Sequence, residues 1–212
     1  MSDVSADWYF DLVSPFAYLQ LEQLAERVPI ERVRLRPVVL GALLEHWGTR
    51  GPAEIPAKRL QTYRSAQWRA EQLGLKFQMP PAHPFNPIKL LRLALVCDAE
   101  YACVREIFRF VWCHGRDAGR PAHWAELLQR LGRPDADSRI EAADIKAQLR
   151  AHTDAAIARG VFGVPTLDLH GELFWGEDAT AMLARAWHDP EWLHSGEWQR
   201  IATLPVGVQR RA

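Results

Sequence analysis

Apolar and polar residues alternate over residues 7–12, DWYFDL, and this period of two predicts a short β-strand. Ser14 and Pro15 follow, and a hydroxyl residue before a proline is typical of a helix start. Apolar residues then recur at helical spacing as far as Val28, and Pro29 ends this pattern. The region therefore predicts a strand followed by a helix.

A second alternation lies in residues 31–40, ERVRLRPVVL, where Val33 and Leu35 are separated by arginines. It predicts a second strand. Strand, helix and strand in close succession form a βαβ unit, so we expect the two strands to be parallel with a right-handed crossover.

The pattern then becomes helical over residues 41–150. Asn86 and Pro87 predict the first residues of one of these helices, and Gly160 predicts the end of the last one. The expected helices cover residues 57–73, 87–100, 102–114, 121–131 and 138–159.

Strands return after the helices. Residues 166–169 and 173–175 flank His170 and Gly171, which predicts a β-hairpin, and a helix is expected over 178–187. The order is βαβ, then helices, then ββα. This order predicts an α/β thioredoxin-like fold of the DsbA type, with an all-helical domain inserted between the two halves.

This order also predicts the domain boundaries. Residues 1–40 and 160–200 are assigned to the discontinuous thioredoxin-like domain, residues 41–159 to the helical insertion, and residues 201–212 to a tail.

Composition excludes several classes of protein. The 212 residues include 26 Lys and Arg against 26 Asp and Glu, so no overall charge favours nucleic acid or an anionic membrane. The chain has no run of 18 apolar residues, and its N-terminus lacks a basic signal region. We expect a cytoplasmic protein that binds neither nucleic acid nor membrane.

The three cysteines, Cys97, Cys103 and Cys113, fit no CxxC or zinc spacing. We expect ordinary buried or half-buried thiols and no metal site.

Ser14 lies where a thioredoxin-like fold carries its reactive residue. Ser14 and Ala17 occupy the positions of the CxxC cysteines, so dithiol exchange is excluded there. A serine at a helix N-terminus can donate a hydrogen bond to a thiolate of another molecule, or it can simply cap the helix. Both interpretations stay open.

Val164 and Pro165 precede the predicted hairpin. An X–Pro bond is the one peptide bond for which the cis form costs little, and a cis bond would let Val164 present its main chain to a bound peptide. A trans proline at the start of an edge strand is the alternative.

Three segments, FDLVSPFAYL, GVFGVPT and LFWGEDATAML, resemble 2-hydroxychromene-2-carboxylate isomerases and the related kappa-class glutathione transferases. The likeness covers about residues 7–190. It implies bound glutathione, a homodimer and a small-molecule substrate.

On this resemblance, Ser14 holds the glutathione sulfur, and Val164, before a cis Pro165, pairs with the cysteinyl backbone. Glu177 and Asp178, which follow Trp175 and Gly176, meet the γ-glutamyl end. Asp178 could instead, or in addition, cap the last helix.

The substrate side departs from the family. The loop 47–54 lacks an Asn found in relatives, and Lys58 with Arg59 could replace it. Phe85 lies near where the isomerases present a Tyr to substrate. Asn86 could face substrate or cap a helix.

Residues 27–76 contain ten Lys or Arg and four Glu. They could form solvated surfaces or a rim that attracts an anionic substrate.

The function expected from the resemblance is a glutathione-dependent isomerase acting on an unsaturated aromatic carboxylate in aromatic catabolism. A kappa-like glutathione transferase or peroxidase, and a non-catalytic thioredoxin-like binding module, remain alternatives.

Overall fold

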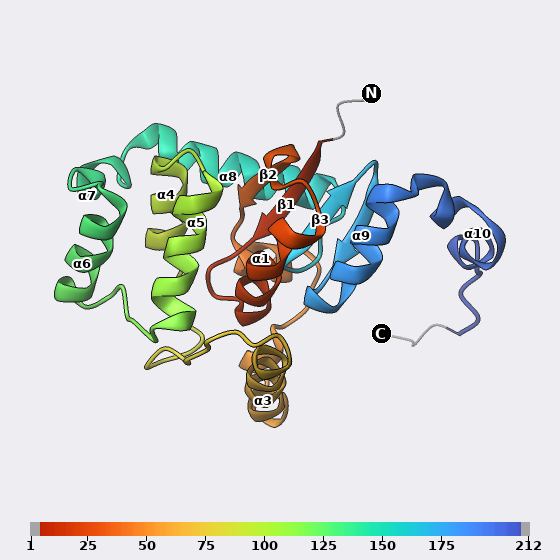
Figure 1. Cartoon of the computed structure of the whole chain (residues 1–212), viewed down its shortest axis with the longest axis horizontal. Helices are drawn as coiled ribbons and strands as arrows, with labels where there is room; N and C mark the ends of the chain where they lie inside the picture. The colour runs from red at the N-terminus through yellow and green to blue at the C-terminus, as the bar shows by residue number, and fades with distance from the viewer. Residues whose placement is uncertain (1–4, 209–212) are drawn as a thin grey trace.

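The computed structural model describes residues 5–208 and has a central sheet with strand order β2-β1-β3-β4 (Figure 1). The strands are β1 (Ala6–Phe10), β2 (Val33–Pro37), β3 (Thr166–Leu169) and β4 (Glu172–Trp175). The helices are α1 (Pro15–Arg27), α2 (Leu40–His46), α3 (Pro56–Gln72), α4 (Ile88–Val96), α5 (Tyr101–Phe108), α6 (Pro121–Leu131), α7 (Ala136–Arg139), α8 (Ala143–Ala158), α9 (Thr180–His188) and α10 (Gly196–Ala202).

The sheet topology confirms the predicted thioredoxin-like fold. β1 pairs with β2 in parallel, as the βαβ unit predicts, and β3 and β4 form the antiparallel hairpin. β3 also pairs antiparallel with β1, with Tyr9 opposite Thr166. The end of β1 therefore lies beside the start of β3, and this register brings the segments that follow and precede these strands together.

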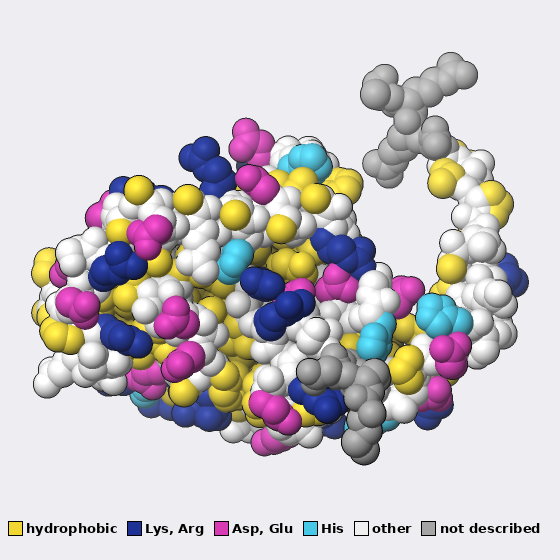
Figure 2. All heavy atoms as spheres, turned by 90° about the horizontal axis from the view of Figure 1, so that it is seen from above, with side chains coloured by type: hydrophobic (Ala, Val, Ile, Leu, Met, Phe, Trp, Pro, Cys, Tyr) yellow, Lys and Arg dark blue, Asp and Glu magenta, His cyan; other side chains and the backbone are white. Residues whose placement is uncertain are grey.

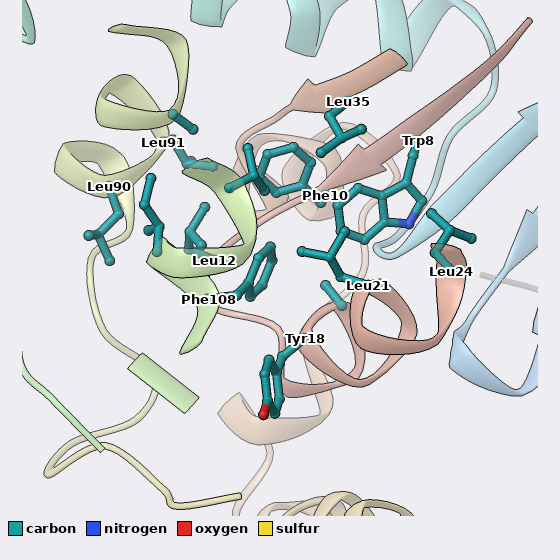
Figure 3. Packing of buried hydrophobic residues seen from close by; sticks show 14 of the residues in the cluster. Trp8, Phe10, Leu12, Tyr18, Leu21, Leu24, Leu35, Leu90, Leu91 and Phe108 are labelled. Carbon is teal, nitrogen blue, oxygen red and sulfur yellow. The ribbon is translucent and has the colours of Figure 1, made fainter. Parts of the chain in front are cut away.

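The core lies between the sheet, α1 and the inserted helices (Figure 3). Trp8 and Phe10 share one face of β1 with ring centroids 4.8 Å apart, and Phe108 of α5 lies 5.6 Å from Phe10. Most buried apolar residues of the sheet form one cluster with those of α4, α5 and α6. Tyr9, which points to the other face of the sheet, packs with Ala156 of α8 in a second cluster.

Several helix limits differ from the prediction. The sequence pattern did not resolve the seven-residue α2. The helix expected over 102–114 consists of α5 and a π turn, Arg109–Cys113, and the one over 138–159 is divided into α7 and α8. The extended backbone of Ala142, with φ of −62° and ψ of 144°, interrupts the latter, whereas buried Ile140 just before it keeps helical angles. The helix expected over 87–100 ends at Val96.

The expectation that Asn86 caps this helix is wrong, because α4 begins one residue later than predicted, with Pro87 as its N-cap and no side-chain cap bond; the Asn86 Oδ1 instead accepts a local hydrogen bond from the Ile88 N–H at 3.0 Å. The expectation of free thiols is wrong for two cysteines. Cys97 and Cys103 form a disulfide across the turn between α4 and α5, with their Cα atoms 6.4 Å apart, and Cys113 is free. Five residues lie between the paired cysteines, and only the path of the turn makes them neighbours.

The C-terminal part of the chain contains more structure than expected. Ile201 and Ala202, which belong to the predicted tail 201–212, are the last residues of α10. Residues 203–208 are exposed without a helix or strand, and residues 209–212 lie outside the described part.

The domain boundaries near residues 40 and 160 remain a prediction. Within residues 5–208, no helix has the length and apolar character needed to cross a membrane.

Candidate functional site

Ser14 lies at the junction of β1 and α1 and is buried, with 6% of its surface exposed. Its Oγ accepts a hydrogen bond from the Ala17 N–H at 3.2 Å, so the serine caps α1. The same hydroxyl donates to the carbonyl oxygen of Val164 at 3.5 Å, 150 residues away in the chain. The fold thus joins the first two candidate residues.

Val164 precedes a cis peptide bond to Pro165, as the resemblance implied. The Thr166 hydroxyl donates to the carbonyl of Gly163 at 2.7 Å, and the Gly176 N–H donates to the carbonyl of Pro165 at 2.9 Å. These bonds fix both sides of the proline loop. The main chain of Val164 consequently lies at the end of the sheet next to the N-terminus of α1.

The carboxylate of Glu177 is buried in an ion pair. Arg69 of α3 donates to both of its oxygens at 2.8 Å, and Gln23 of α1 donates to Oε1 at 2.8 Å. Asp178 is exposed and does not cap α9. Of the two expected γ-glutamyl contacts, therefore, Asp178 has the accessible carboxylate, while the side chain of Glu177 joins α3 to the site.

Trp175 covers the proline loop from β4. Its indole lies 5.0 Å from the ring of Phe162 and is 54% exposed. A Cβ atom at Gly163 would lie 2.7 Å from the Trp175 Nε1 atom, so a larger residue there would force the indole to shift. The two aromatic rings meet edge to face.

The residues expected on the substrate side belong to the first turn of α3 and to the segment before α4. Lys58 is exposed on α3, and Asn86 is exposed at the start of α4. Phe85 is half-buried and, with Asn86, lines a cavity of about 450 Å³ between residues 80–92 and 116–119. Ser14 and Lys58 do not line this cavity. This cavity therefore does not join the expected substrate residues to Ser14.

Asp11 organises the loop before Ser14 and was not singled out from the sequence. Its carboxylate is fully buried and accepts hydrogen bonds from the N–H groups of Val13 at 3.0 Å and Leu40 at 2.8 Å. Burial, the dominant effect, raises the pKa of Asp11 to about 7, although both hydrogen bonds favour the ionised form. Asp11 thereby ties the Ser14 loop to the start of α2.

His83 contacts the same loop from the segment before α4. Its Nε2 lies 2.8 Å from the carbonyl oxygen of Val13, and its Nδ1 lies 3.1 Å from the Tyr63 hydroxyl. Because a carbonyl can only accept, Nε2 carries the proton. Burial, the largest effect, and the charge of Arg59 lower the pKa of His83, against an opposite effect of the bond to Val13.

Asp11, His83 and Arg69 are the main site residues that the sequence reasoning missed. Asp11 stands within the recognised segment FDLVSPFAYL, and His83 stands beside Phe85 and Asn86 in HPFNP, so short-range signals existed for both. No such signal existed for Arg69, whose partner is 108 residues away.

The basic segment 27–76 is partly neutralised. Arg34 and Arg36 both form ion pairs with Asp7, at 2.9 Å. Lys58 is exposed. On the face shown in Figure 2, basic and acidic side chains are interspersed.

Among residues 5–208, no group of three or more His, Cys, Asp or Glu side chains is placed to hold a metal ion.

Comparison with known proteins agrees with this geometry. The chain is 28% identical over 189 residues to the 2-hydroxychromene-2-carboxylate isomerase of Pseudomonas putida, covering 85% of this chain and 92% of the relative. It is 23% identical over 199 residues to glutathione S-transferase kappa 2 of Caenorhabditis elegans, covering 84% and 88%.

A solved structure of a 2-hydroxychromene-2-carboxylate isomerase superposes with a TM-score of 0.77 at 26% identity and covers 86% of this chain and 94% of that one. These similarities confirm the resemblance inferred from the sequence segments. The family model of the DsbA-like thioredoxin domain matches residues 6–188. The chain therefore belongs to the DsbA-like thioredoxin domain family.

Proposed function

We propose that the protein is a glutathione-dependent isomerase that acts on an unsaturated aromatic carboxylate of the 2-hydroxychromene-2-carboxylate type. The observation that carries this proposal is the Ser14 hydroxyl at the N-terminus of α1, 3.5 Å from the carbonyl of Val164 beside the cis proline. Ser14 and Ala17 stand where a dithiol enzyme has cysteines, so the thiol must come from another molecule.

The residues present fit glutathione. An extended peptide can pair with the main chain of Val164 as an added strand. Asp178 can pair with the ligand's ammonium group, and N–H groups at the start of the 3₁₀ turn Glu177–Ala179 can receive its carboxylate. Bound glutathione would supply a thiolate that adds reversibly to an unsaturated carbon, which permits bond rotation or ring opening before it leaves unchanged.

The protein's own contribution is electrostatic. A free thiol has a pKa of about 8.5 and is mostly protonated near neutral pH. The Ser14 hydroxyl can rotate from Val164 to donate to the sulfur, and the N-terminus of α1 favours a nearby negative charge. Both groups are in place before the reaction, so little reorganisation is needed when charge develops.

The identities of the relatives support an enzyme that uses glutathione and favour the isomerase. A kappa-like transferase or peroxidase with the same thiolate is the second candidate, supported by the kappa relatives. The homodimer and the cytoplasmic location remain predictions from the sequence and its resemblance.

The first test is replacement of Ser14 by alanine. A hydrogen bond to a charged group is worth roughly 1.5–3 kcal/mol, so we expect turnover to fall about ten- to a hundredfold. An ultraviolet titration of bound glutathione should show an alkaline shift of the thiol pKa. Ser195→Ala is the matched control, because Ser195 precedes α10 with no side-chain cap bond. Unchanged titration and turnover in Ser14→Ala would reduce Ser14 to a helix cap.

Product accounting separates the candidates. An isomerase consumes no glutathione, whereas a transferase consumes one molecule per turnover. A binding module would bind glutathione in calorimetry but would show neither turnover nor a lowered thiol pKa.

A further inference from the structure

Side chains from the inserted segment hold the loop that carries Ser14. The indole Nε1–H of Trp112 donates to the carbonyl of Leu12 at 2.9 Å, and His83 donates to the carbonyl of Val13 at 2.8 Å. Trp112 is fully buried, and its ring centroid lies 5.5 Å from that of His83. The two carbonyls just before Ser14 are therefore held by neighbouring side chains from outside the sheet.

The bond from His83 fixes the peptide unit that joins Val13 to Ser14. The carbonyl of that unit accepts from His83, and its N–H donates to the carbonyl of Asp11 at 3.1 Å. With both polar atoms held, the peptide plane cannot rotate freely, and the direction in which the Ser14 side chain leaves the backbone is set. The Ala17 N–H also holds the Ser14 Oγ, at 3.2 Å, but the contact that the hydroxyl donates to Val164, at 3.5 Å, is weak, so the direction of the side chain depends on this peptide unit as well.

His83 is itself held on its opposite side. Tyr63 of α3 donates its hydroxyl proton to the main-chain carbonyl of His83 at 2.8 Å. The Tyr63 hydroxyl oxygen also lies 3.1 Å from the Nδ1 atom of His83. The two rings meet edge to face at 5.3 Å. Tyr63 thus contacts both the main chain and the ring edge of His83 on the side away from Val13.

We propose that His83 is a positioning residue for thiolate activation, which aligns the Ser14 hydroxyl with the glutathione sulfur by holding the carbonyl of Val13. The inference rests on the proposed function. It adds a residue to which the resemblance gives no role, and it makes activation of the thiol depend on the inserted segment as well as on the thioredoxin-like half.

Two polar substitutions test this inference. His83→Gln places an amide N–H near the position of Nε2 and keeps a donor for Val13. His83→Asn is one carbon shorter and places its amide near the position of Nδ1, facing Tyr63. We expect turnover about tenfold lower and an alkaline shift of the bound thiol pKa in His83→Asn, with both largely restored in His83→Gln. The glutathione concentration for half-saturation should stay within about twofold, because the γ-glutamyl contacts are untouched.

His152→Gln is the matched control, because His152 is also half-buried but faces Arg36 at 3.4 Å, away from the loop. Thermal unfolding of each variant checks that the fold is kept. Equal behaviour of His83→Gln and His83→Asn, whether both active or both impaired, would overturn the positioning role. A thiol shift in Ser14→Ala with none in His83→Asn would overturn this inference alone. Failure of the wild type to bind glutathione would overturn the proposed function as well.

Discussion

The hydroxyl of Ser14 accepts the Ala17 N–H and still has its own proton to donate. The two interpretations of this residue, helix cap and thiolate donor, therefore use different parts of one group and do not compete. Capping even serves the second role, because it holds Oγ at the helix N-terminus, where a negative charge is favoured. At the scale of single residues, Asp11 and His83 then decide how rigidly this group is held.

Asp11 should make stability depend on pH. Its pKa is raised by burial to about 7 in the folded chain and returns to about 3.8 on unfolding. Below pH 3.8, the pKa of the unfolded chain, Asp11 is protonated in both states and its contribution to stability is complete. This contribution is lost as the pH rises to about 7, the pKa of Asp11 in the folded chain. In this window the wild type should lose up to about 1.4 kcal/mol of unfolding free energy per pH unit relative to Asp11→Asn, which cannot titrate.

Chemical denaturation across that pH range measures the difference between wild type and variant. Asp154→Asn, at an exposed position of α8, serves as the control and should follow the wild type. Parallel pH profiles for wild type and Asp11→Asn would contradict the raised pKa.

At the scale of elements, the site is formed where strands end and helices begin. The β1–α1 junction supplies Ser14, the approach to β3 supplies Val164, and the turn after β4 supplies Asp178. Antiparallel pairing of β3 with both β1 and β4 brings these three segments to one end of the sheet. The turn after β4 depends on Gly176, whose φ of +97° and ψ of 156° suit only glycine.

Gly176→Ala tests this turn. A side chain there meets both the unfavourable backbone conformation and the Asp178 carboxylate, so the unfolding free energy should fall by roughly 1–3 kcal/mol. Glutathione affinity should fall with it. Gly41→Ala is the opposite case, because Gly41 is exposed within α2 with nothing within 4 Å of an added Cβ. That variant should gain about 0.5–1 kcal/mol. Equal effects of the two variants in chemical denaturation would contradict the special role of the turn.

At the scale of the whole molecule, two buried carboxylates join the inserted helices to the thioredoxin-like half. Glu177 receives Arg69 of α3, and Glu22 of α1 receives Arg105 of α5 and Arg109 of the π turn, at 2.7–3.2 Å. Burial alone would raise the pKa of Glu22, but the hydrogen bonds from both arginines lower it below its usual value. The insertion is thus attached by charge as well as by the shared core.

Glu22→Gln should weaken this attachment. Both arginines keep about a third of their side chains exposed, so we expect a loss of about 1–3 kcal/mol near pH 7, below the cost for a fully buried pair. A lowered pKa means that the contribution is complete above about pH 4.5, the unfolded value, and disappears as pH falls through the folded value. Denaturation at neutral and acidic pH measures both effects.

Glu197→Gln is the control, because Glu197 and Arg200 form an ion pair in which both side chains are exposed. It should have a much smaller effect on stability. A Glu22→Gln loss that did not diminish at acidic pH would argue against an ionised Glu22 as its cause.

Much of the fold could be predicted because its signals are local. Short stretches of sequence predict three of its features. These are the strand before Ser14, the Ser-Pro helix start and the hairpin around His170 and Gly171. Helix limits were less predictable, because the residues around the break at Ala142 carry no proline or glycine that would mark it. The Cys97–Cys103 disulfide depends on the path of a tight turn and was missed.

The candidate site divides in the same way. The sequence by itself determined that Ser14 would begin a helix without a partner cysteine, and that Val164 would precede a proline before a strand. Tertiary structure alone decided that His83 would form a hydrogen bond with the Val13 carbonyl and that Arg69 would form an ion pair with Glu177. This ion pair leaves Asp178 as the accessible carboxylate. The physical reason is range. Backbone preferences and hydrophobic periodicity are written in neighbouring residues, whereas a hydrogen bond between residues 70 or 108 positions apart exists only once packing has set both partners in place.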